Sequence, residues 1–454
     1  MPINNKFINK HQKIKPFSEE EISRVLKKTR LGTNLHCHFE GILNSSDLEH
    51  IAERLGKISN FKTSTWVLIE KIMNGENESL NGFLNRLSGR WIRLLLIKAV
   101  LKGHHTFDTA FPYFVKSVLE KIYNEGVGML ELMVSVMTLT NEGDFFLVPI
   151  KEDFIPEEIQ LINLWNQQVK SWQRVRSPEI KTLSVQHCFK LFNKIIEEDK
   201  RYCYSGQKKA NTFQMEIGLK FMIRREKDKR YSNYSETLAM EVNKIKDLYN
   251  NNLIVGVDIA GDECNMKTYL DDYSVFLKKL NELEIPFTVH AGEIPENDTK
   301  LKKLAYANLK DSVLLSPKRI GHAVRLFDKN LKMMVLLRKV LKKKIFIEVN
   351  VSSNILTKTV DNAEVHPILL AMKGKHPLFK KNRELLDRLY ELILVCDDDP
   401  VTGKSKNSIA HELALTTFFT GNLGFSTSLE LLQHLNDNAR RAKFVYKKYQ
   451  ENSW

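Results

Sequence analysis

A chain of 454 residues with 69 Lys and Arg against 55 Asp and Glu carries a formal net charge of +14. No apolar run is long enough to cross a bilayer, and the first residues are polar and lack the apolar centre of a signal peptide. The five cysteines form no CxxC pair and no disulfide-framework spacing. These features argue against membrane proteins and disulfide-rich secreted proteins, and we expect a cytoplasmic protein with reduced thiols.

Positive charge of this size attracts phosphates, nucleotides or nucleic acid. It gathers in basic stretches, among them residues 224–230, 338–344 and 373–383. No motif that interleaves basic and aromatic residues for base stacking accompanies them. We interpret most of these stretches as solvated helix faces, and we expect neither nucleic acid nor a membrane as a partner. The sequence leaves open whether the chain forms a homo-oligomer.

The predicted elements begin with a basic segment over residues 1–30, which ends in a helix predicted over 18–28. Ser18 and Glu21 have the spacing of a capping box at its start. Helical patterns further along the chain lie, for example, over 235–250, 299–309 and 329–343. Between such patterns, apolar and β-branched content predicts eight strands. In chain order they are 33–38, 128–136, 214–223, 253–260, 286–290, 319–324, 345–352 and 391–397.

Eight strands that alternate with helices predict a parallel sheet closed into a (β/α)8 TIM barrel, an α/β fold. We therefore expect residues 31–454 to form a single domain. The chain is longer than a minimal barrel, and two stretches, over 44–127 and 137–212, are predicted to be insertions over the barrel mouth. Active sites of such barrels lie at the carboxyl ends of the strands.

The first predicted strand carries His36 and His38. Side chains alternate along a strand, so both imidazoles point to the same side and can share a cation. Gly41, shortly after the strand, permits a turn. Two half-buried histidines that form hydrogen bonds and bind no metal are the alternative.

A second motif ends the strand predicted over 286–290. His290 is followed by two small residues and by Glu293. Imidazole is the commonest metal ligand among side chains, and a carboxylate just past the strand can act as a general acid or base beside the metal. An ordinary strand end with a surface glutamate is the alternative.

Three consecutive aspartates close the last predicted strand: Asp397, Asp398 and Asp399. In an enclosed site their carboxylates would repel one another and lose solvation, and a bound cation relieves both costs. A solvated acidic turn is the alternative, which the apolar run before the aspartates disfavours.

With the segments 260–263 and 319–322, Glu348, and the pair Ser353 and Asn354, these motifs form an ordered set. The set resembles that of the adenosine deaminase family of metal-dependent amidohydrolases. The resemblance reaches from about residue 33 to about residue 444 and includes the stretch 438–444, which is similar to the family's C-terminal helix. It implies a hydrolytic deaminase on an eight-stranded barrel.

The resemblance also implies roles for particular motif residues. Glu293 would protonate N1 of a purine, and His322 and Asp399 would orient a water and take its proton. The backbone of Gly261, which has no side chain to prevent close approach, would contact N3. Glu40 and His38 would also face the substrate. One Zn²⁺ per protomer, with the water at its open position, would be held by His36, His38, His290 and Asp398.

Three further residues belong to the set without a direct role in the reaction. Glu348 and Asn354 have the character of acceptors that hold the second ring nitrogen of a metal-ligating histidine. Plain hydrogen bonding at the strand ends is the alternative. His366 stands in a His-Pro pair that the family also shows after its seventh strand, and we expect it to pack rather than to take part in chemistry.

The resemblance implies adenosine or deoxyadenosine as substrate, converted to inosine or deoxyinosine with release of ammonia. Glu40 is a departure, because the family usually has an aspartate there that contacts the ribose end. The lysine-rich stretch 373–383 is another, and it can meet a 5′-phosphate. AMP or dAMP is therefore the alternative substrate, with bacterial nucleotide-based defence as one setting for that activity, and free adenine ranks third.

Two interpretations from other classes stay open. A two-metal amidohydrolase would commonly use a carboxylated lysine on its fourth strand, and the run 253–260 contains no lysine. An inactive, basic binding module would keep the barrel for partner recognition. The complete set of ligand and acid–base residues argues against this second alternative.

Overall fold

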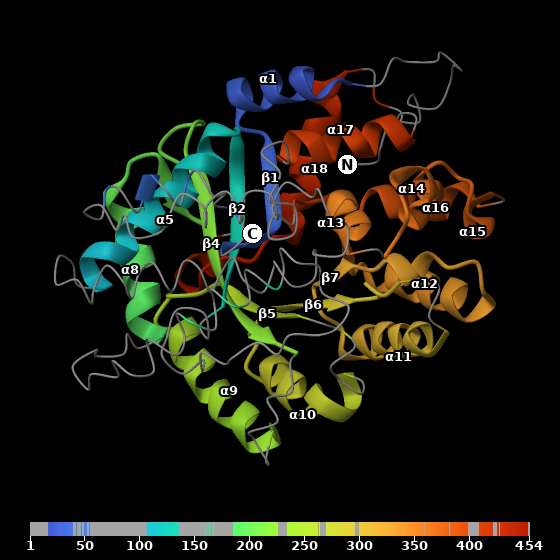
Figure 1. Ribbon diagram of the computed structural model, residues 1–454, viewed down its shortest axis with the longest axis horizontal. Helices are drawn as coiled ribbons and strands as arrows, with labels where there is room; N and C mark the ends of the chain where they lie inside the picture. The colour runs from blue at the N-terminus through green and yellow to red at the C-terminus, as the bar shows by residue number, and fades with distance from the viewer. Residues whose placement is uncertain are drawn as a thin grey trace.

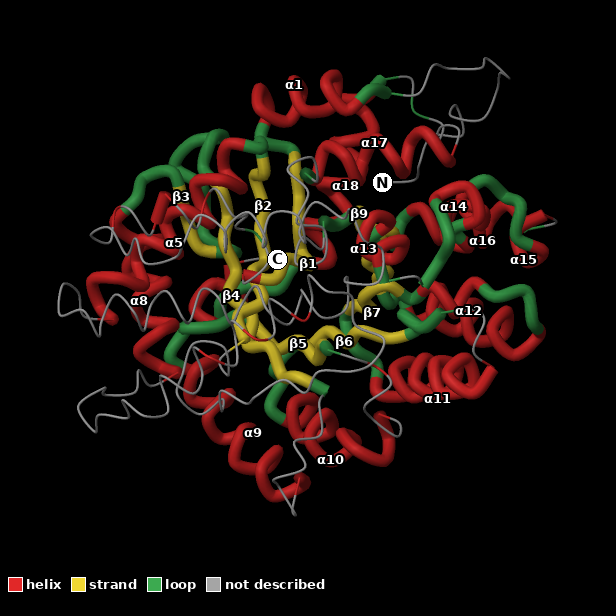
Figure 2. The backbone as a smooth tube through the Cα atoms, viewed as in Figure 1, coloured by secondary structure: helices red, strands yellow, loops and turns green. Residues whose placement is uncertain are grey.

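A computed structural model gives the fold. It describes residues 17–39, 42, 47, 50–51, 54, 107–135, 159, 163, 167, 185–225, 234–261, 263, 269–295, 299–357, 359–380, 382–397, 408–420, 425 and 427–452. Within these residues, strands lie at the centre and helices surround them (Figure 1). The tube coloured by secondary structure shows the same two layers (Figure 2). One continuous apolar cluster, from Phe17 to Tyr446, fills the space between the layers.

The strands pair in the order β1-β2-β4-β5-β6-β7-β8-β9, and every pairing along this path is parallel. This is the predicted (β/α)8 barrel. The short strand β3 pairs with β4 outside the path. The bounds are β1 Gly32–His38, β2 Val127–Ser135, β3 Tyr202–Tyr204, β4 Met215–Arg224, β5 Gly256–Ala260, β6 Phe287–Ala291, β7 Arg319–His322, β8 Phe346–Val349 and β9 Ile393–Val395.

Helices connect the strands and cover the barrel, and α9 to α12 pack side by side in chain order. The α-helices are α1 Glu19–Thr29, α5 Phe107–Asn124, α8 Val185–Glu198, α9 Tyr234–Asn250, α10 Tyr269–Glu282, α11 Thr299–Leu315, α12 Leu331–Lys343, α13 Val351–Leu356, α14 Pro367–Met372, α15 Pro377–Lys380, α16 Arg383–Tyr390, α17 Ile409–Thr420 and α18 Ser428–Ala442. The 3₁₀ helices among the described residues are η5 Val324–Phe327, η6 Ala363–Val365 and η8 Lys447–Asn452. Among the described helices, none combines the length and the apolarity that crossing a bilayer requires.

The eight predicted strands are confirmed, with ends that differ by up to three residues. β7 ends early because His322 and Ala323 have φ angles of 62° and 51°, which turn the chain out of the extended conformation. β8 ends early because the following residues begin α13, where the carboxylate of Glu412 accepts from the amides of Val351 and Ser352. β3 was not predicted, because three residues are too few to show a periodic pattern.

The barrel closes between β1 and the residues after β9 through a side-chain amide. Asn34 in β1 donates from Nδ2 to the carbonyl of Asp397 at 2.9 Å and accepts from its backbone N–H at 3.3 Å. A second amide, Asn438 of α18, donates to the carbonyl of Ile393 at 3.0 Å. Asn34 thereby holds the start of the aspartate run against the strand that carries His36.

The first helix and the two predicted insertions can be followed in part. The Ser18 hydroxyl accepts from the amide of Glu21 at 3.1 Å and caps α1, as the spacing predicted. The described ends of the insertions, α5 and α8, pack against each other, and α5 also packs against β2. Most of both insertions lies outside the described residues, so their place over the barrel mouth stays a prediction.

Candidate active site

Histidines from three strands meet in one buried cluster. His36 lies in β1, His290 near the end of β6 and His322 at the end of β7. One ring nitrogen from each lies within 4.8 Å of the other two. The ring of His38 lies beside them, with its centroid 5.7 Å from that of His36 and 5.5 Å from that of His290. The structure therefore brings together the four histidines to which the resemblance gave a metal or acid–base role.

A polar contact at Nδ1 orients each of the three clustered rings. The partners are oxygen atoms that can only accept, so Nδ1 carries the proton and Nε2 is the nitrogen with the lone pair that can bind a cation. Such contacts are usual for metal-ligating histidines. They join Glu348 to His36 at 2.7 Å, Asp258 to His290 at 2.9 Å and Asn354 to His322 at 2.9 Å.

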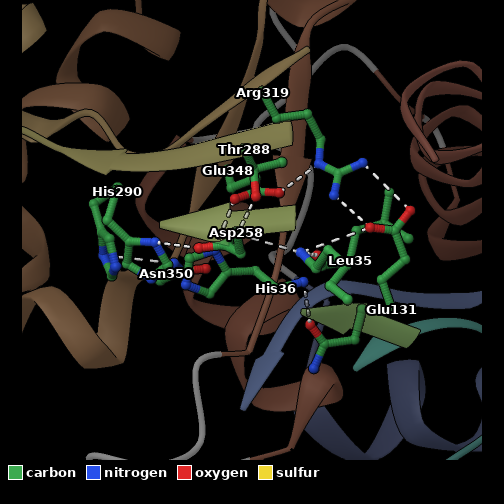
Figure 3. Close-up of polar contacts among 12 residues, drawn as sticks. Leu35, His36, Glu131, Asp258, Thr288, His290, Arg319, Glu348 and Asn350 are labelled. Atoms are coloured by element: carbon green, nitrogen blue, oxygen red, sulfur yellow. Dashed lines mark hydrogen bonds and ion pairs between the residues drawn. The ribbon is translucent and has the colours of Figure 1, made fainter. Parts of the chain in front are cut away.

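A buried ionic network supports the contact to His36 (Figure 3). Glu348 faces His36 with one carboxylate oxygen and accepts from Arg319 Nε with the other, at 2.6 Å. The other guanidinium nitrogens of Arg319 donate to both oxygens of Glu131. No side chain in this network is more than 1% exposed. Glu348 is thus held on two sides, and with it the ring of His36.

Asp258 holds His290 in a similar way. Thr288 donates to Asp258 Oδ2, and Lys220 Nζ lies 3.5 Å from the same oxygen. Burial alone would raise the pKa of Asp258, but His290 and Lys220 hold that pKa well below its usual range. Asp258 is therefore ionised, and its Oδ1 lies 2.9 Å from His290 Nδ1.

The electrostatics of the cluster favour a cation. Burial, followed by the neighbouring His290 and His322, lowers the pKa of His36 well below that of an ordinary histidine. Burial and His290 do the same for the pKa of His38. The rings of His36 and His38 are therefore neutral, which is the form that binds metal. The side chains beneath the rings add one net negative formal charge. The two cations are Lys220 and Arg319, and the three anions are Glu131, Asp258 and Glu348.

His322 is fixed by a chain of side-chain amide and imidazole contacts. Asn354 faces His322 Nδ1 with its oxygen and donates from Nδ2 to His366 Nε2 at 3.1 Å. Burial lowers the pKa of His366 to about 3, so His366 is a neutral acceptor. The Nε2 atom of His322 lies 3.4 Å from the carboxylate of Glu293. This contact joins two residues to which the sequence assigned proton transfer.

The backbone at these strand ends is locally strained. His322 has a left-handed φ angle, which is uncommon outside glycine and concentrates at functional sites. Gly261, just past β5, has a φ angle of 105°, and Gly292, just before Glu293, has one of 80°. Glycine adopts such angles without steric cost. The structure places Gly261 and Glu293 after neighbouring strands, where the sequence predicted them.

The donor set fits a zinc ion better than a hard-oxygen cation. Zinc takes imidazole nitrogen readily, whereas magnesium and calcium prefer oxygen ligands. Room beside the rings is preserved by Gly321, where a Cβ would lie 2.8 Å from Cε1 of His36. His322 belongs to the same 4.8 Å group as His36 and His290, although the resemblance gives it an acid–base role.

Three predicted site residues, Glu40, Asp398 and Asp399, lie outside the described residues, and their roles stay predictions. Sequence reasoning in turn gave no role to the buried charges of Glu131, Lys220, Asp258 and Arg319. A signal was available for Glu131, Lys220 and Asp258, because each places a charge between apolar neighbours in a strand, whereas Arg319 follows Lys318 at the start of β7 and gave none. Buried charges are rare unless they are paired.

Comparisons with known proteins find one family of similar sequences. The adenosine deaminase family model matches residues 207–378. The adenosine deaminase of Shewanella denitrificans is 30% identical over 202 residues, which are 43% of this chain and 51% of that protein. The chain spans less than two thirds of the length of the curated relatives that it matches.

Solved structures show the same fold over nearly the whole chain. The N6-mAMP deaminase of Arabidopsis thaliana superposes with a TM-score of 0.56 at 18% identity and covers 95% of this chain and 98% of its own. A zinc-bound amidohydrolase from Burkholderia ambifaria superposes with a TM-score of 0.58 at 16% identity, over 97% and 92%. The family model and the relatives make the chain similar to adenosine deaminases over part of its length, and these solved structures show that it shares their fold.

Proposed function

We propose that this chain is a zinc-dependent hydrolytic deaminase that replaces the 6-amino group of an adenine nucleoside with oxygen. The single observation that supports it most is the cluster of His36, His290 and His322, with each Nδ1 held and the carboxylate of Glu293 3.4 Å from His322 Nε2. That arrangement combines a cation site with an acid–base pair. The overall reaction takes up one water and releases one ammonia.

The side chains divide the proton transfers between them. When bound, zinc would make a water acidic enough to attack at neutral pH. Glu293 protonates N1 of the purine, which withdraws electrons from C6 and makes it electrophilic. His322 Nε2 takes the proton that the attacking water loses and passes it to the amino group, which leaves C6 as ammonia. The hydroxyl then bonded to C6 gives its remaining proton to Glu293, which restores the acid and leaves the 6-oxo product with a proton on N1. Asp398 would complete the zinc ligands and Asp399 would assist His322.

Two variants test this proposal. His290→Ala removes a ligand, so zinc and activity should be lost together. Glu293→Gln keeps the size of the side chain but cannot protonate N1, so zinc should be retained while kcat falls by about 10²- to 10⁴-fold. Near-normal turnover of Glu293→Gln, or full activity in a zinc-free preparation, would refute the mechanism.

AMP or dAMP is the second candidate substrate. The chain carries a net charge of +14, and one of its structural neighbours acts, by its name, on a modified AMP. The predicted phosphate contacts are less well supported, because Lys373, Lys375 and Lys380 are exposed at the ends of α14 and α15. Figure 1 shows α15 at the right edge of the molecule, outside α14 and α16.

A lysine variant separates the two candidates. Lys373, Lys375, Lys380 and Lys381 are replaced together by alanine, and kcat/KM is compared for adenosine and AMP. If the stretch binds a phosphate, kcat/KM should fall for AMP alone, and the fall should shrink with added salt because exposed charges are screened. Equal changes for both substrates would identify the lysines as a solvated surface. Free adenine, the third candidate, serves as a substrate that lacks the sugar.

A further inference from the structure

Glu263 belongs to the 260–263 motif, in which the resemblance and the proposed mechanism give a role to Gly261 alone. It lies just past β5 and is only 2% exposed. Its carboxylate accepts from the amides of Gly292 at 2.9 Å and Glu293 at 3.0 Å, and from Asn308 Nδ2 at 3.0 Å. Glu263 thus fixes the turn after β6, and this turn carries Glu293, the proposed acid.

Arg225 faces Glu263 from the end of β4. It is fully buried, and its Nη1 atom lies 4.0 Å from Glu263 Oε2. The same Nη1 atom donates to the carbonyl of His290 at 2.7 Å, and Nη2 donates to the carbonyl of Gly261. One guanidinium therefore ties the end of β5 to the end of β6.

The two side chains together join two backbone segments. One carries Gly261, and the other runs from His290 to Glu293. The hydrogen bonds that Arg225 and Glu263 make to these segments are charge-assisted, and such bonds are stronger than neutral ones. Little freedom remains in the second segment, because Gly292 has a φ angle of 80° and a Cβ there would lie 3.0 Å from Leu309. The pair thus holds in register two residues that are proposed to contact the same purine ring.

A buried ion pair is weak support for stability, because desolvation opposes its attraction. The ion pair lies directly behind two proposed substrate contacts, so a role in placing those contacts explains it better than a contribution to stability. We propose that Arg225 and Glu263 are positioning residues, which set the spacing between the purine contact at Gly261 and the acid Glu293. This inference rests on the proposed function.

The first experiment compares two buried carboxylates. Glu263→Gln removes the charge that holds the Glu293 turn, and Glu216→Gln removes a carboxylate that pairs with Lys443 at the other end of the barrel. We expect kcat/KM to fall about 10- to 100-fold in Glu263→Gln, because small misplacements of an acid are costly. Zinc content should stay at the wild-type level. Glu216→Gln should lose thermal stability but keep its kcat/KM.

A double variant distinguishes positioning from general damage. If Glu263 acts through Glu293, adding Glu263→Gln to Glu293→Gln should lower kcat/KM by less than about 3-fold, because residues that act as a unit are not additive. If the two losses multiply, Glu263 does not act through Glu293 and the inference is overturned. A wild-type protein that deaminates no purine would instead overturn the proposed function.

Asn308→Ala covers the case in which Glu263→Gln does not fold. It removes one of the donors to Glu263 and touches no proposed ligand or substrate contact. We expect kcat/KM to fall about 3- to 10-fold, the equivalent of one ordinary hydrogen bond, with zinc content unchanged. An Asn308→Ala protein with lowered thermal stability but wild-type kcat/KM would overturn the inference.

Discussion

Glu348→Gln should lower the zinc affinity of this chain, although Glu348 is not predicted to touch the metal. In the wild type, Glu348 Oε2 contacts His36 Nδ1 at 2.7 Å and Oε1 accepts from Arg319 at 2.6 Å. Glutamine can still accept one hydrogen bond, but it has no charge and offers only one oxygen. We expect zinc affinity to fall about 10- to 100-fold, the usual effect of losing the partner of a ligating histidine.

The same change should also destabilise the fold. Arg319 and Glu348 are both fully buried, so the substitution leaves a guanidinium with one carboxylate partner instead of two. Breaking a buried ion pair costs about 3–5 kcal/mol of unfolding free energy. Urea unfolding of the zinc-free proteins measures this term, because bound metal would otherwise add its own stabilisation.

Glu131→Gln is the matched control for the metal effect. Glu131 pairs with the same Arg319, is 1% exposed and is not in contact with a histidine in the network of Figure 3. Its loss should lower stability to a similar extent and leave zinc affinity near the wild-type value. Competition with a chelator of known affinity gives both dissociation constants. Unchanged affinity in Glu348→Gln, or equal losses in both variants, would refute the role of Glu348 in orienting His36.

Two further predictions follow from particular distances and pKa shifts. Gly321→Ala should lower zinc content after dialysis, because the added Cβ would lie 2.8 Å from His36 Cε1. Gly32→Ala is the control: its Cβ would lie 2.9 Å from the Gly126 carbonyl oxygen, away from the histidines, so it should lower stability alone. Equal zinc content in the two variants would contradict this prediction. The second concerns pH. Burial lowers the pKa of His366 to about 3. As the pH falls, His366 takes up a proton in the unfolded chain near pH 6.5 and in the folded chain only near pH 3. The folded state is therefore destabilised relative to the unfolded state as the pH falls from about 6.5 toward 3. At pH 5 the loss is about 2 kcal/mol, from about 1.4 kcal/mol per pH unit. His366→Gln should remove that part of the difference in urea stability between pH 7 and pH 5, and an unchanged difference would contradict the assignment.

The sequence predicted the strands well because strands of a parallel barrel are buried on both sides and read as apolar runs. His36, His290 and Glu293 could be recognised because each stands in or just after a predicted strand. The pairings beneath them could not. Glu131 and Arg319 are 188 residues apart, and only the closed barrel brings them together.

The closure of the barrel was hidden for a related reason. Asn34 joins β1 to Asp397 through a side-chain amide across 363 residues, and no local pattern marks that contact. Similarly, Glu263 reaches the Glu293 turn from a different strand end. Local periodicity predicts elements, whereas contacts between strand ends depend on the order in which the strands close.

The most direct test of the account measures ammonia release by the zinc-loaded chain from adenosine, deoxyadenosine, AMP, dAMP, ATP and adenine, followed by the change in purine absorbance. We predict about one zinc per protomer, as expected for a single ligand set that leaves one position open. We also predict deamination of at least one substrate at a rate proportional to the zinc bound. Folded, zinc-loaded protein that releases no ammonia from any of them would contradict the account.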